Sequence, residues 1–171
     1  MYFSFIIHIR FYVFDKAILQ TIFIYVNTYV KKPYNFFMSK EKPFDKELFF
    51  AALADNTRLR LLNLMDQDEV CVCYFVEVIG PNQPKISRHL AYLKKAGIVD
   101  VRRDWKWAHY RIVKPENEQA AKVLQGVLEW LKTDLEMQND RRALFNVCCA
   151  PQPPVSIQGA PRPASIEACI K

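Results

Sequence analysis

The stretch that decides the fold runs from Asn82 to Gly97 and reads NQPKISRHLAYLKKAG. Its end signals predict a single helix. Asn82 or Gln83 stands where a helix N-cap belongs, and Pro84 suits the first turn. Gly97 suits the left-handed position that follows the last turn of a helix.

The two faces of this predicted helix differ in chemistry. Three apolar residues recur at i, i+4 and i+7 and form the face that we expect to be buried: Ile86, Leu90 and Leu93. The opposite face carries side chains suited to phosphates and base edges: Gln83, Lys85, Ser87, Arg88, His89 and Tyr92. Since most of these lie in the N-terminal half, we expect that half to contact DNA.

Positive charge concentrates in this part of the chain. Between Asn82 and Lys114, nine Lys and Arg residues stand against two acids, a net charge of +7, whereas the whole chain of 171 residues carries +6. The positive charge therefore belongs to one segment. A segment of this kind indicates a polyanionic partner, and double-stranded DNA fits it best.

Apolar spacing predicts more helices before this stretch. One amphipathic run ends near Asp55, and either Asp55 or Asn56 can cap a second run over residues 59–65. A short third helix is predicted from Glu69 to Val78, because Gly80-Pro81 permits a left-handed turn and stops the helix.

A hairpin is predicted after the DNA-contacting helix. Residues 98–101 and 108–113 have strand character, and they enclose a basic and aromatic tip over residues 102–107. Three cations of this hairpin are predicted DNA contacts: Arg102, Arg103 and Lys106. Two short helices followed by a charged hairpin predict a fold that is mainly α with a β-hairpin wing, a winged helix-turn-helix.

We divide the chain into three parts. Residues 1–37 are an apolar extension whose longest uncharged run is shorter than a membrane helix needs. Two alternatives stay open for this extension: either translation starts only at Met38, or the extension is a membrane anchor. We expect no stable membrane association. Residues 38–140 form the DNA-binding and dimerisation domain, which closes on a helix whose broad apolar stripe reaches Leu135 and suits a dimer contact. Residues 141–171 form a Cys-containing, Pro-rich tail that is expected to be largely disordered.

The five cysteines predict metal chemistry in a reducing cytoplasm, since their spacing does not resemble a disulfide framework. Cys71 and Cys73 stand two apart on the third predicted helix, about 200° from each other around its axis. One ion could bind both only if that turn unwound, which would couple binding to loss of the DNA-binding shape. Thiolates select soft ions such as As(III), Sb(III), Cd(II), Pb(II) or Cu(I).

Residues 48–113 resemble the ArsR/SmtB family of metalloregulatory repressors, in the segment FAALADNTRLRLL from Phe50, in Glu69-Val-Cys-Val-Cys73, and in the helix of residues 83–97. The resemblance implies a homodimer that sits on an operator overlapping its own promoter and leaves when an ion binds. It implies no enzyme activity and no required cofactor, with As(III) or Sb(III) as inducer. It does not extend to residues 1–37 or 150–171.

The sequence departs from one family pattern at the third arsenic ligand. Members with a Cys-Val-Cys box and a cysteine three residues later have that cysteine where this chain has Val76. Cys148 or Cys149 is the expected replacement, from the same or the partner subunit, and Cys169 is a weaker candidate. Residues 1–70 lack the cysteines expected of a cadmium or lead sensor, and residues 116–140 lack the histidine expected of a zinc sensor.

Two alternatives keep the same fold and change the signal. One is a cadmium- or lead-responsive repressor. The other is a redox switch in which cysteine oxidation releases DNA. An enzyme is disfavoured, because the chain has no Cys-x-x-Cys motif and no Gly-rich phosphate loop.

Overall fold

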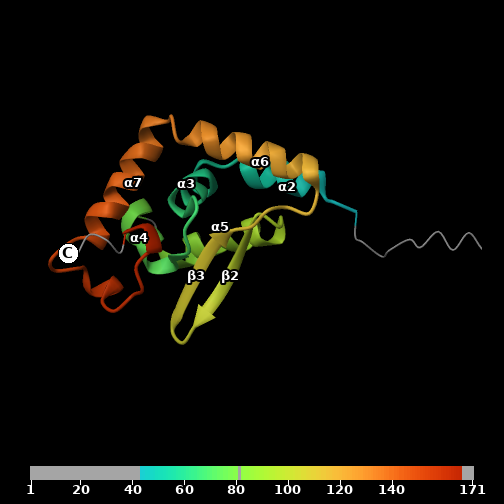
Figure 1. The fold of residues 1–171 in the computed structure, drawn as a ribbon. Helices are drawn as coiled ribbons and strands as arrows, with labels where there is room; N and C mark the ends of the chain where they lie inside the picture. The colour runs from blue at the N-terminus through green and yellow to red at the C-terminus, as the bar shows by residue number, and fades with distance from the viewer. Residues whose placement is uncertain (1–42, 81, 167–171) are drawn as a thin grey trace, which may run out of the picture. The chain divides into compact units, whose positions relative to one another are not determined.

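The computed structural model describes residues 43–80 and 82–166 (Figure 1). In chain order the helices and strands of this part are α2 (Lys46–Leu53), α3 (Asn56–Met65), β1 (Val70–Cys71), α4 (Val72–Ile79), α5 (Gln83–Lys95), β2 (Val99–Asp104), β3 (Trp107–Ile112), α6 (Glu118–Leu131), α7 (Leu135–Cys148) and the 3-10 turn η2 (Val155–Ile157). The strands form one antiparallel sheet in the order β1-β3-β2.

The α2–α3 corner is closed by side chains. Asp55 is the residue that caps α3, and its carboxylate accepts a hydrogen bond from the Arg58 backbone N–H at 2.9 Å. The Arg58 guanidinium donates to the carbonyls of Ala51 and Ala52 at 2.7 and 2.8 Å. Because these are carbonyls of the last turn of α2, Arg58 fixes the direction in which the chain leaves that helix.

The helix-turn-helix consists of α4, Gly80 and α5. Gly80 ends α4 in the left-handed region at φ +84°, and the Asn82 side chain caps α5 by accepting from the Lys85 N–H at 3.2 Å. Gly97 follows α5 at φ +71°. The three predicted apolar residues are fully buried: Ile86, Leu90 and Leu93. The sequence prediction for this helix is confirmed at both ends and on its buried face.

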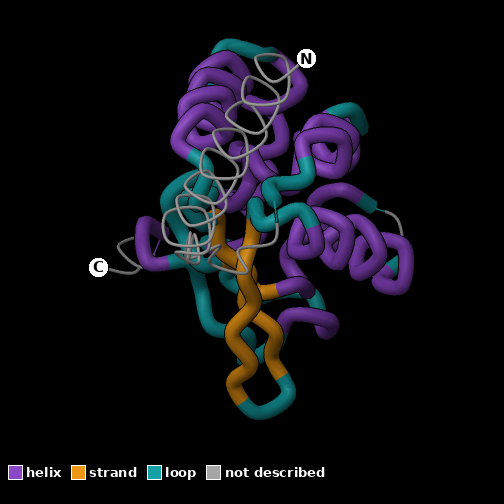
Figure 2. Tube along the Cα trace, turned by 90° about the vertical axis from the view of Figure 1, so that its right-hand side faces the viewer, coloured by secondary structure: helices purple, strands orange, loops and turns teal. Residues whose placement is uncertain are grey.

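The hairpin wing, β2 with β3, extends away from the helices (Figures 1 and 2). Its strands pair from Val99↔Ile112 to Asp104↔Trp107, so they run closer to the tip than the sequence predicts. β1 pairs with β3 as a third strand, where the sequence predicts helix. The predicted fold class, mainly α with a hairpin wing, is confirmed.

The C-terminal part differs from the prediction. The single predicted helix is two helices, α6 and α7, and α7 packs on α3 and α4. Residues 150–166, named here the C-terminal segment, are not a disordered tail: Ile157 is buried in the core and the Tyr74 hydroxyl donates to the Ala160 carbonyl at 3.2 Å. The reason is that irregularly spaced apolar residues and prolines pack without forming a periodic pattern.

In the described part of the chain, no helix has the length and apolar character that crossing a bilayer requires. The predictions for residues 1–37 lie outside the described residues.

Candidate nucleic-acid interface and thiol site

The predicted DNA contacts on α5 divide into two groups. Gln83, Lys85 and Arg88 are exposed and Ser87 is half-buried, so this N-terminal part of the helix is open to a partner. Asn82 fixes this end of α5 through its cap, which gives the exposed side chains a rigid base.

The other two predicted contacts on α5 pack against the α2–α3 corner. His89 Nδ1 lies 3.4 Å from an Asp55 carboxylate oxygen, and only 17% of the His89 side chain is exposed. The Arg58 guanidinium lies 4.6 Å from the centre of the Tyr92 ring. In this structure His89 and Tyr92 therefore join α5 to the preceding helices, a role that the sequence pattern did not reveal.

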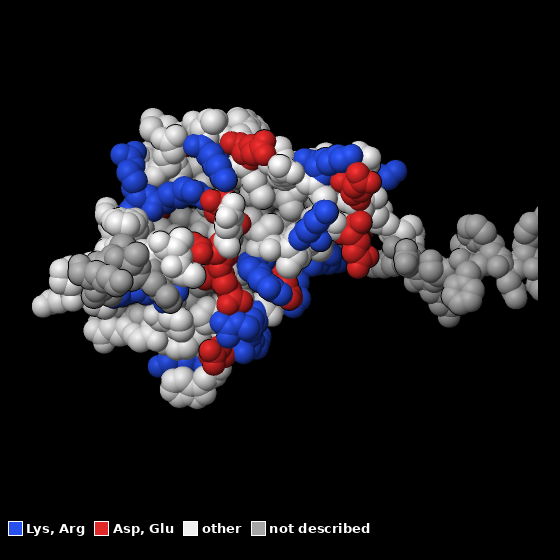
Figure 3. Space-filling view, viewed as in Figure 1, with Lys and Arg blue, Asp and Glu red and all other residues white. Residues whose placement is uncertain are grey.

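The tip of the hairpin wing presents a cation between two aromatic rings. Lys106 Nζ lies 4.8 Å from the ring centres of both Trp105 and Trp107, and 86% of Trp105 is exposed. Arg103 is exposed on the neighbouring strand. On the face seen in Figure 3, Lys and Arg side chains gather over the hairpin and alternate with acidic side chains.

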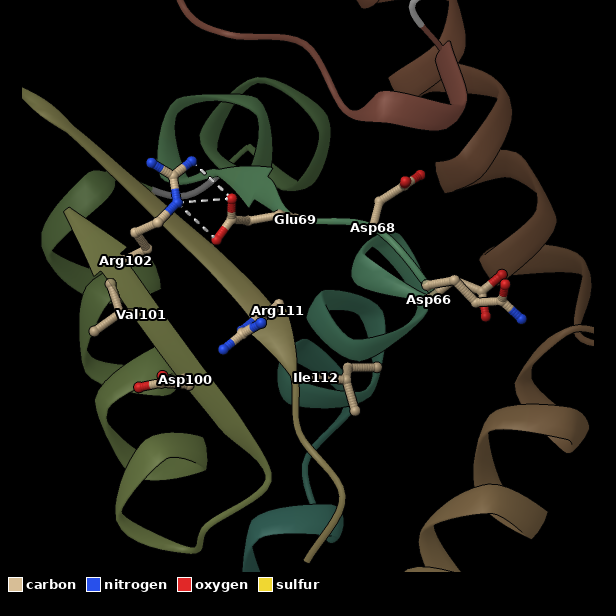
Figure 4. Close-up of a pocket in the computed structure, with 9 residues that line it drawn as sticks. Asp66, Asp68, Glu69, Asp100, Val101, Arg102, Arg111 and Ile112 are labelled. Carbon is tan, nitrogen blue, oxygen red and sulfur yellow. Dashed lines mark hydrogen bonds and ion pairs between the residues drawn. The ribbon is translucent and has the colours of Figure 1, made fainter. Parts of the chain in front are cut away.

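Arg102, the third predicted contact of the hairpin, is bound to an acid. Its guanidinium donates to both Glu69 carboxylate oxygens, the shortest N–O distance being 2.7 Å (Figure 4). This hydrogen bond lowers the pKa of Glu69. The pair lines a groove of about 660 Å³ that also contains the acids Asp66, Asp68 and Asp100. Because carboxylates repel phosphate, these acids make the groove a poor surface for DNA, although Arg102 and Arg111 also line it.

The thiol site is built differently from the sequence prediction. Cys71 ends β1 with extended backbone (φ −67°, ψ 140°), and α4 begins only at Val72. Because Cys71 is outside the helix, its Sγ lies 2.9 Å from the Sγ of Cys73. The prediction that the two thiols point about 200° apart on one helix is wrong, and so is its consequence that the turn must unwind before one ion can reach both.

Cys71 and Cys73, named here the thiol pair, are joined by a hydrogen bond between their sulfurs. The Cys73 thiol donates a hydrogen bond to Cys71, which lowers the pKa of Cys71 to about 7 and raises that of Cys73. Cys71 is fully buried and Cys73 half-buried. The pair therefore offers one thiolate near neutral pH, next to a second thiol.

The two other predicted ligands differ from each other. Cys148 is a free, buried thiol at the end of α7, and burial raises its pKa to about 11. Cys149 is disulfide-bonded. Among residues 43–80 and 82–166, no three His, Cys, Asp or Glu side chains are grouped closely enough to hold a metal ion. Cys169 lies outside the described residues.

His109 is a residue whose environment the sequence did not predict. It is buried on β3, directly opposite Cys71 on β1 and Arg102 on β2, and its Nε2 has no hydrogen-bond partner. Burial lowers its pKa, so a neutral imidazole is favoured. Successive side chains of a strand point to opposite faces of the sheet, so the pairing register of β3 would have been enough to place His109 on the inner face.

The chain is similar to known regulators. A family model described as "Bacterial regulatory protein, arsR family" matches residues 55–101. The arsenic resistance transcriptional regulator ArsR1 of Pseudomonas putida is 40% identical over 92 residues, which are 51% of this chain and 72% of that protein. The arsenical resistance operon repressor of Escherichia coli is 36% identical over 107 residues, 58% of this chain and 92% of the repressor.

A cadmium regulator is also similar over a shorter stretch. The cadmium resistance transcriptional regulatory protein CadC of Listeria innocua is 40% identical over 65 residues, 37% of this chain and 55% of that protein. These relatives are transcription regulators and not enzymes. The identities over most of the length of the two arsenic regulators, together with the winged helix-turn-helix, show that the chain belongs to the arsR family of bacterial regulatory proteins.

Proposed function

We propose that the protein is a homodimeric transcriptional repressor that binds operator DNA and leaves it when trivalent arsenic or antimony binds the thiol pair. The observation that carries this proposal is the 2.9 Å approach of the Cys71 and Cys73 sulfurs at the start of α4, the first helix of the helix-turn-helix. The thiol pair can bind a soft ion, and it lies at the start of α4, the helix that supports the proposed DNA-reading helix α5.

The DNA-binding part of the proposal rests on exposure and charge. In a winged helix-turn-helix the second helix lies in the major groove and the wing reaches the neighbouring backbone. Gln83, Lys85 and Arg88 are exposed on that helix, and Arg103 and Lys106 are exposed on the wing. Side chains with an amide or guanidinium group can read base edges, while the lysines neutralise phosphate.

The inducer part of the proposal rests on the geometry of the thiol pair. Two sulfurs that share one pyramidal As(III) ion, at ion–sulfur distances of about 2.3 Å and angles of roughly 90–100°, are separated by roughly 3.3–3.5 Å. The pair, whose sulfurs lie 2.9 Å apart, must therefore open by roughly 0.5 Å when it chelates. Because Cys73 lies in the first turn of α4 and Cys71 in β1, this opening displaces α4 relative to the sheet.

The dimer part of the proposal rests on apolar side chains that the single chain leaves exposed. Phe50 on α2 is 56% exposed, and Val123 and Trp130 on α6 are 38% and 67% exposed. A second copy of the chain is the partner we propose for these side chains, since large exposed apolar groups mark interfaces. We place the protein in the cytoplasm, where thiols stay reduced.

Cadmium and oxidation are two alternative signals that experiment can distinguish from arsenic. Similarity to a cadmium regulator favours a test of Cd(II). The proximity of the two sulfurs favours a test of oxidation to a disulfide, which would also change the thiol pair.

The experiment is a titration of the protein bound to a fluorescent fragment of its own promoter, followed by anisotropy, with a phosphine reductant present. Arsenite, antimonite, cadmium and zinc are added separately. Release by arsenite and antimonite at the lowest concentrations is the expected result. Release by cadmium alone would show that the repressor responds to cadmium instead of arsenic. Release only by an oxidant, with the reductant left out, would show that it responds to oxidation of its cysteines.

A further inference from the structure

The turn at the tip of the hairpin wing carries an unexpected residue. β2 ends at Asp104 and β3 begins at Trp107, and these two residues pair, so Trp105 and Lys106 alone form the turn. The backbone of Trp105 is in the left-handed region, at φ +50°. Hairpin turns favour glycine at a position of positive φ, because a Cβ is strained there. A tryptophan in this place therefore points to a use of its ring outside the fold.

The Trp105 ring is open to a partner and held by its neighbour. At 86% exposure it is the most exposed large apolar side chain of residues 43–80 and 82–166. Lys106 Nζ lies 4.8 Å from the centre of this ring and 4.8 Å from that of Trp107, which packs against the core. Because both contacts are cation–π interactions, Lys106 links the exposed ring to the half-buried one and restrains its orientation.

The charges around the ring favour nucleic acid as the partner. Lys106 follows the ring in the chain, and Arg103 is exposed on β2. Asp104, the acid that precedes the ring, has a carboxylate oxygen 3.4 Å from the Arg102 guanidinium, which offsets its charge. Cations can bind phosphates while a flat aromatic ring stacks on bases. The wing tip thus combines the two kinds of group with which proteins bind a nucleic-acid strand.

We propose that Trp105 enters the minor groove of the operator and stacks against a base step there, so that the wing selects DNA by how easily that step opens. This inference rests on the proposed function, in which α5 lies in the major groove. The hairpin extends away from the helices, so its tip can reach past the backbone that borders that groove (Figures 1 and 2). The minor groove is only about 6 Å wide, which suits a flat ring entering edge-on. Apolar side chains inserted there partly unstack the bases.

The chemistry of the indole determines which step it selects. Its N–H can only donate a hydrogen bond. In the minor groove an A·T pair offers acceptors alone, whereas a G·C pair adds an amino group that is itself a donor. Pyrimidine–purine steps such as TA are the ones that unstack most easily. The wing should therefore favour a TA step over a GC step, at positions that α5 does not contact.

The experiment compares the full wild-type chain with Trp105→Gly on its own promoter fragment. Glycine suits the positive φ of the turn, so this variant removes the ring and keeps the hairpin. Hydroxyl-radical footprinting locates the step under each wing, which is then built as TA or as GC, and anisotropy measures the affinities. Val155→Ala, which truncates an 84% exposed side chain far along the chain from the wing, is the control.

Two readouts report on the ring. We expect Trp105→Gly to bind the TA fragment roughly 5- to 100-fold more weakly and to lose the preference for TA over GC, with an unchanged salt dependence because no cation is removed. We expect Trp105→Phe, which keeps an aromatic ring, to retain part of the preference. With 2-aminopurine in place of adenine at the TA step, fluorescence should rise when the wild type or the control binds and stay low with Trp105→Gly.

The outcomes separate this inference from the proposed function. A wild-type protein that does not bind its promoter overturns the proposed function. A wild type that binds but shows the same affinities as Trp105→Gly on both fragments overturns the inference alone. An equal loss of affinity on both fragments also overturns it, because the ring would then bind DNA without selecting a step. If Trp105→Gly changed only the oligomeric state in sedimentation, the ring would contact a second copy of the chain, and the minor-groove assignment would be wrong.

Discussion

Removing the Asp140 carboxylate should strongly destabilise the protein, because Asp140 fastens α7 to α3. Arg60 on α3 binds it through two hydrogen bonds, Nε to Oδ2 and Nη2 to Oδ1, both 2.7 Å long. Only 8% of the Asp140 side chain and 21% of the Arg60 side chain are exposed. The same interface contains the bond from Asn63 Nδ2 to the Met137 carbonyl at 2.8 Å.

The size of the effect follows from this burial. Breaking a buried ion pair by removing one partner costs about 3–5 kcal/mol, because the other charge is left uncompensated. Arg60 is partly exposed and keeps Glu136, whose Oε1 lies 3.5 Å from its Nε. We therefore expect Asp140→Ala to lower the free energy of unfolding by about 2–3 kcal/mol.

The assay is urea unfolding of the full chain, followed by circular dichroism, for the wild type and the variant. Glu136→Ala is the matched control on the same helix: half of its side chain is exposed, so a loss below about 1 kcal/mol is expected. A double-mutant cycle with Arg60→Ala isolates the pair. If Asp140→Ala cost no more than the control, α7 would not be docked on α3 as described, and the position of Cys148 beside α4 would lose its support.

Three further predictions concern DNA, the cap of α5 and the thiol pair. Arg88→Ala should weaken operator binding by about 1–3 kcal/mol if Arg88 reads a base. Lys106→Ala should mainly reduce the salt dependence of binding, lowering the number of released counterions by about one. Anisotropy at several salt concentrations measures both effects, and unchanged binding would remove the substituted residue from the interface. Asn82→Ala should lower the free energy of unfolding by about 1 kcal/mol through loss of the cap, and an unaltered thermal midpoint would contradict this. The ultraviolet thiolate absorbance should rise with a midpoint near pH 7 because the hydrogen bond from Cys73 lowers the pKa of Cys71. Cys73→Ala should move the midpoint upward, and an unchanged midpoint would show that this hydrogen bond does not lower the pKa of Cys71.

Helix α5 could be predicted from the sequence because its signals are local. The cap at Asn82, the glycine at Gly97 and the apolar spacing between them all lie within one short segment. Local signals of this kind are independent of the rest of the fold. The same is true of the hairpin, whose limits the sequence gives to within a few residues.

The thiol geometry could not be predicted because it depends on a distant strand. Val70 and Cys71 are extended since they pair with Tyr110 and His109, which follow 40 and 38 residues later in the chain. An apolar run before a helix looks like part of that helix when the pairing strand is not known. The structure therefore replaces an unwinding mechanism with a preformed thiol pair.

Helix α7 was missed for another reason. Its buried residues include Asp140, whose charge interrupts the apolar spacing of Met137, Leu144 and Cys148. A charged residue normally marks an exposed face, and only the partner Arg60 explains its burial. The sequence pattern does not identify such a pair from either residue alone.

In the proposed function, the thiol pair converts ion binding into DNA release. Its most direct test measures arsenite-induced release from promoter DNA for the single variants Cys71→Ser and Cys73→Ser, with Val72→Ala, which keeps both thiols, as the control. We expect all three variants to bind DNA like the wild type and only the control to be released by arsenite. Release of either serine variant at the wild-type arsenite concentration would contradict it.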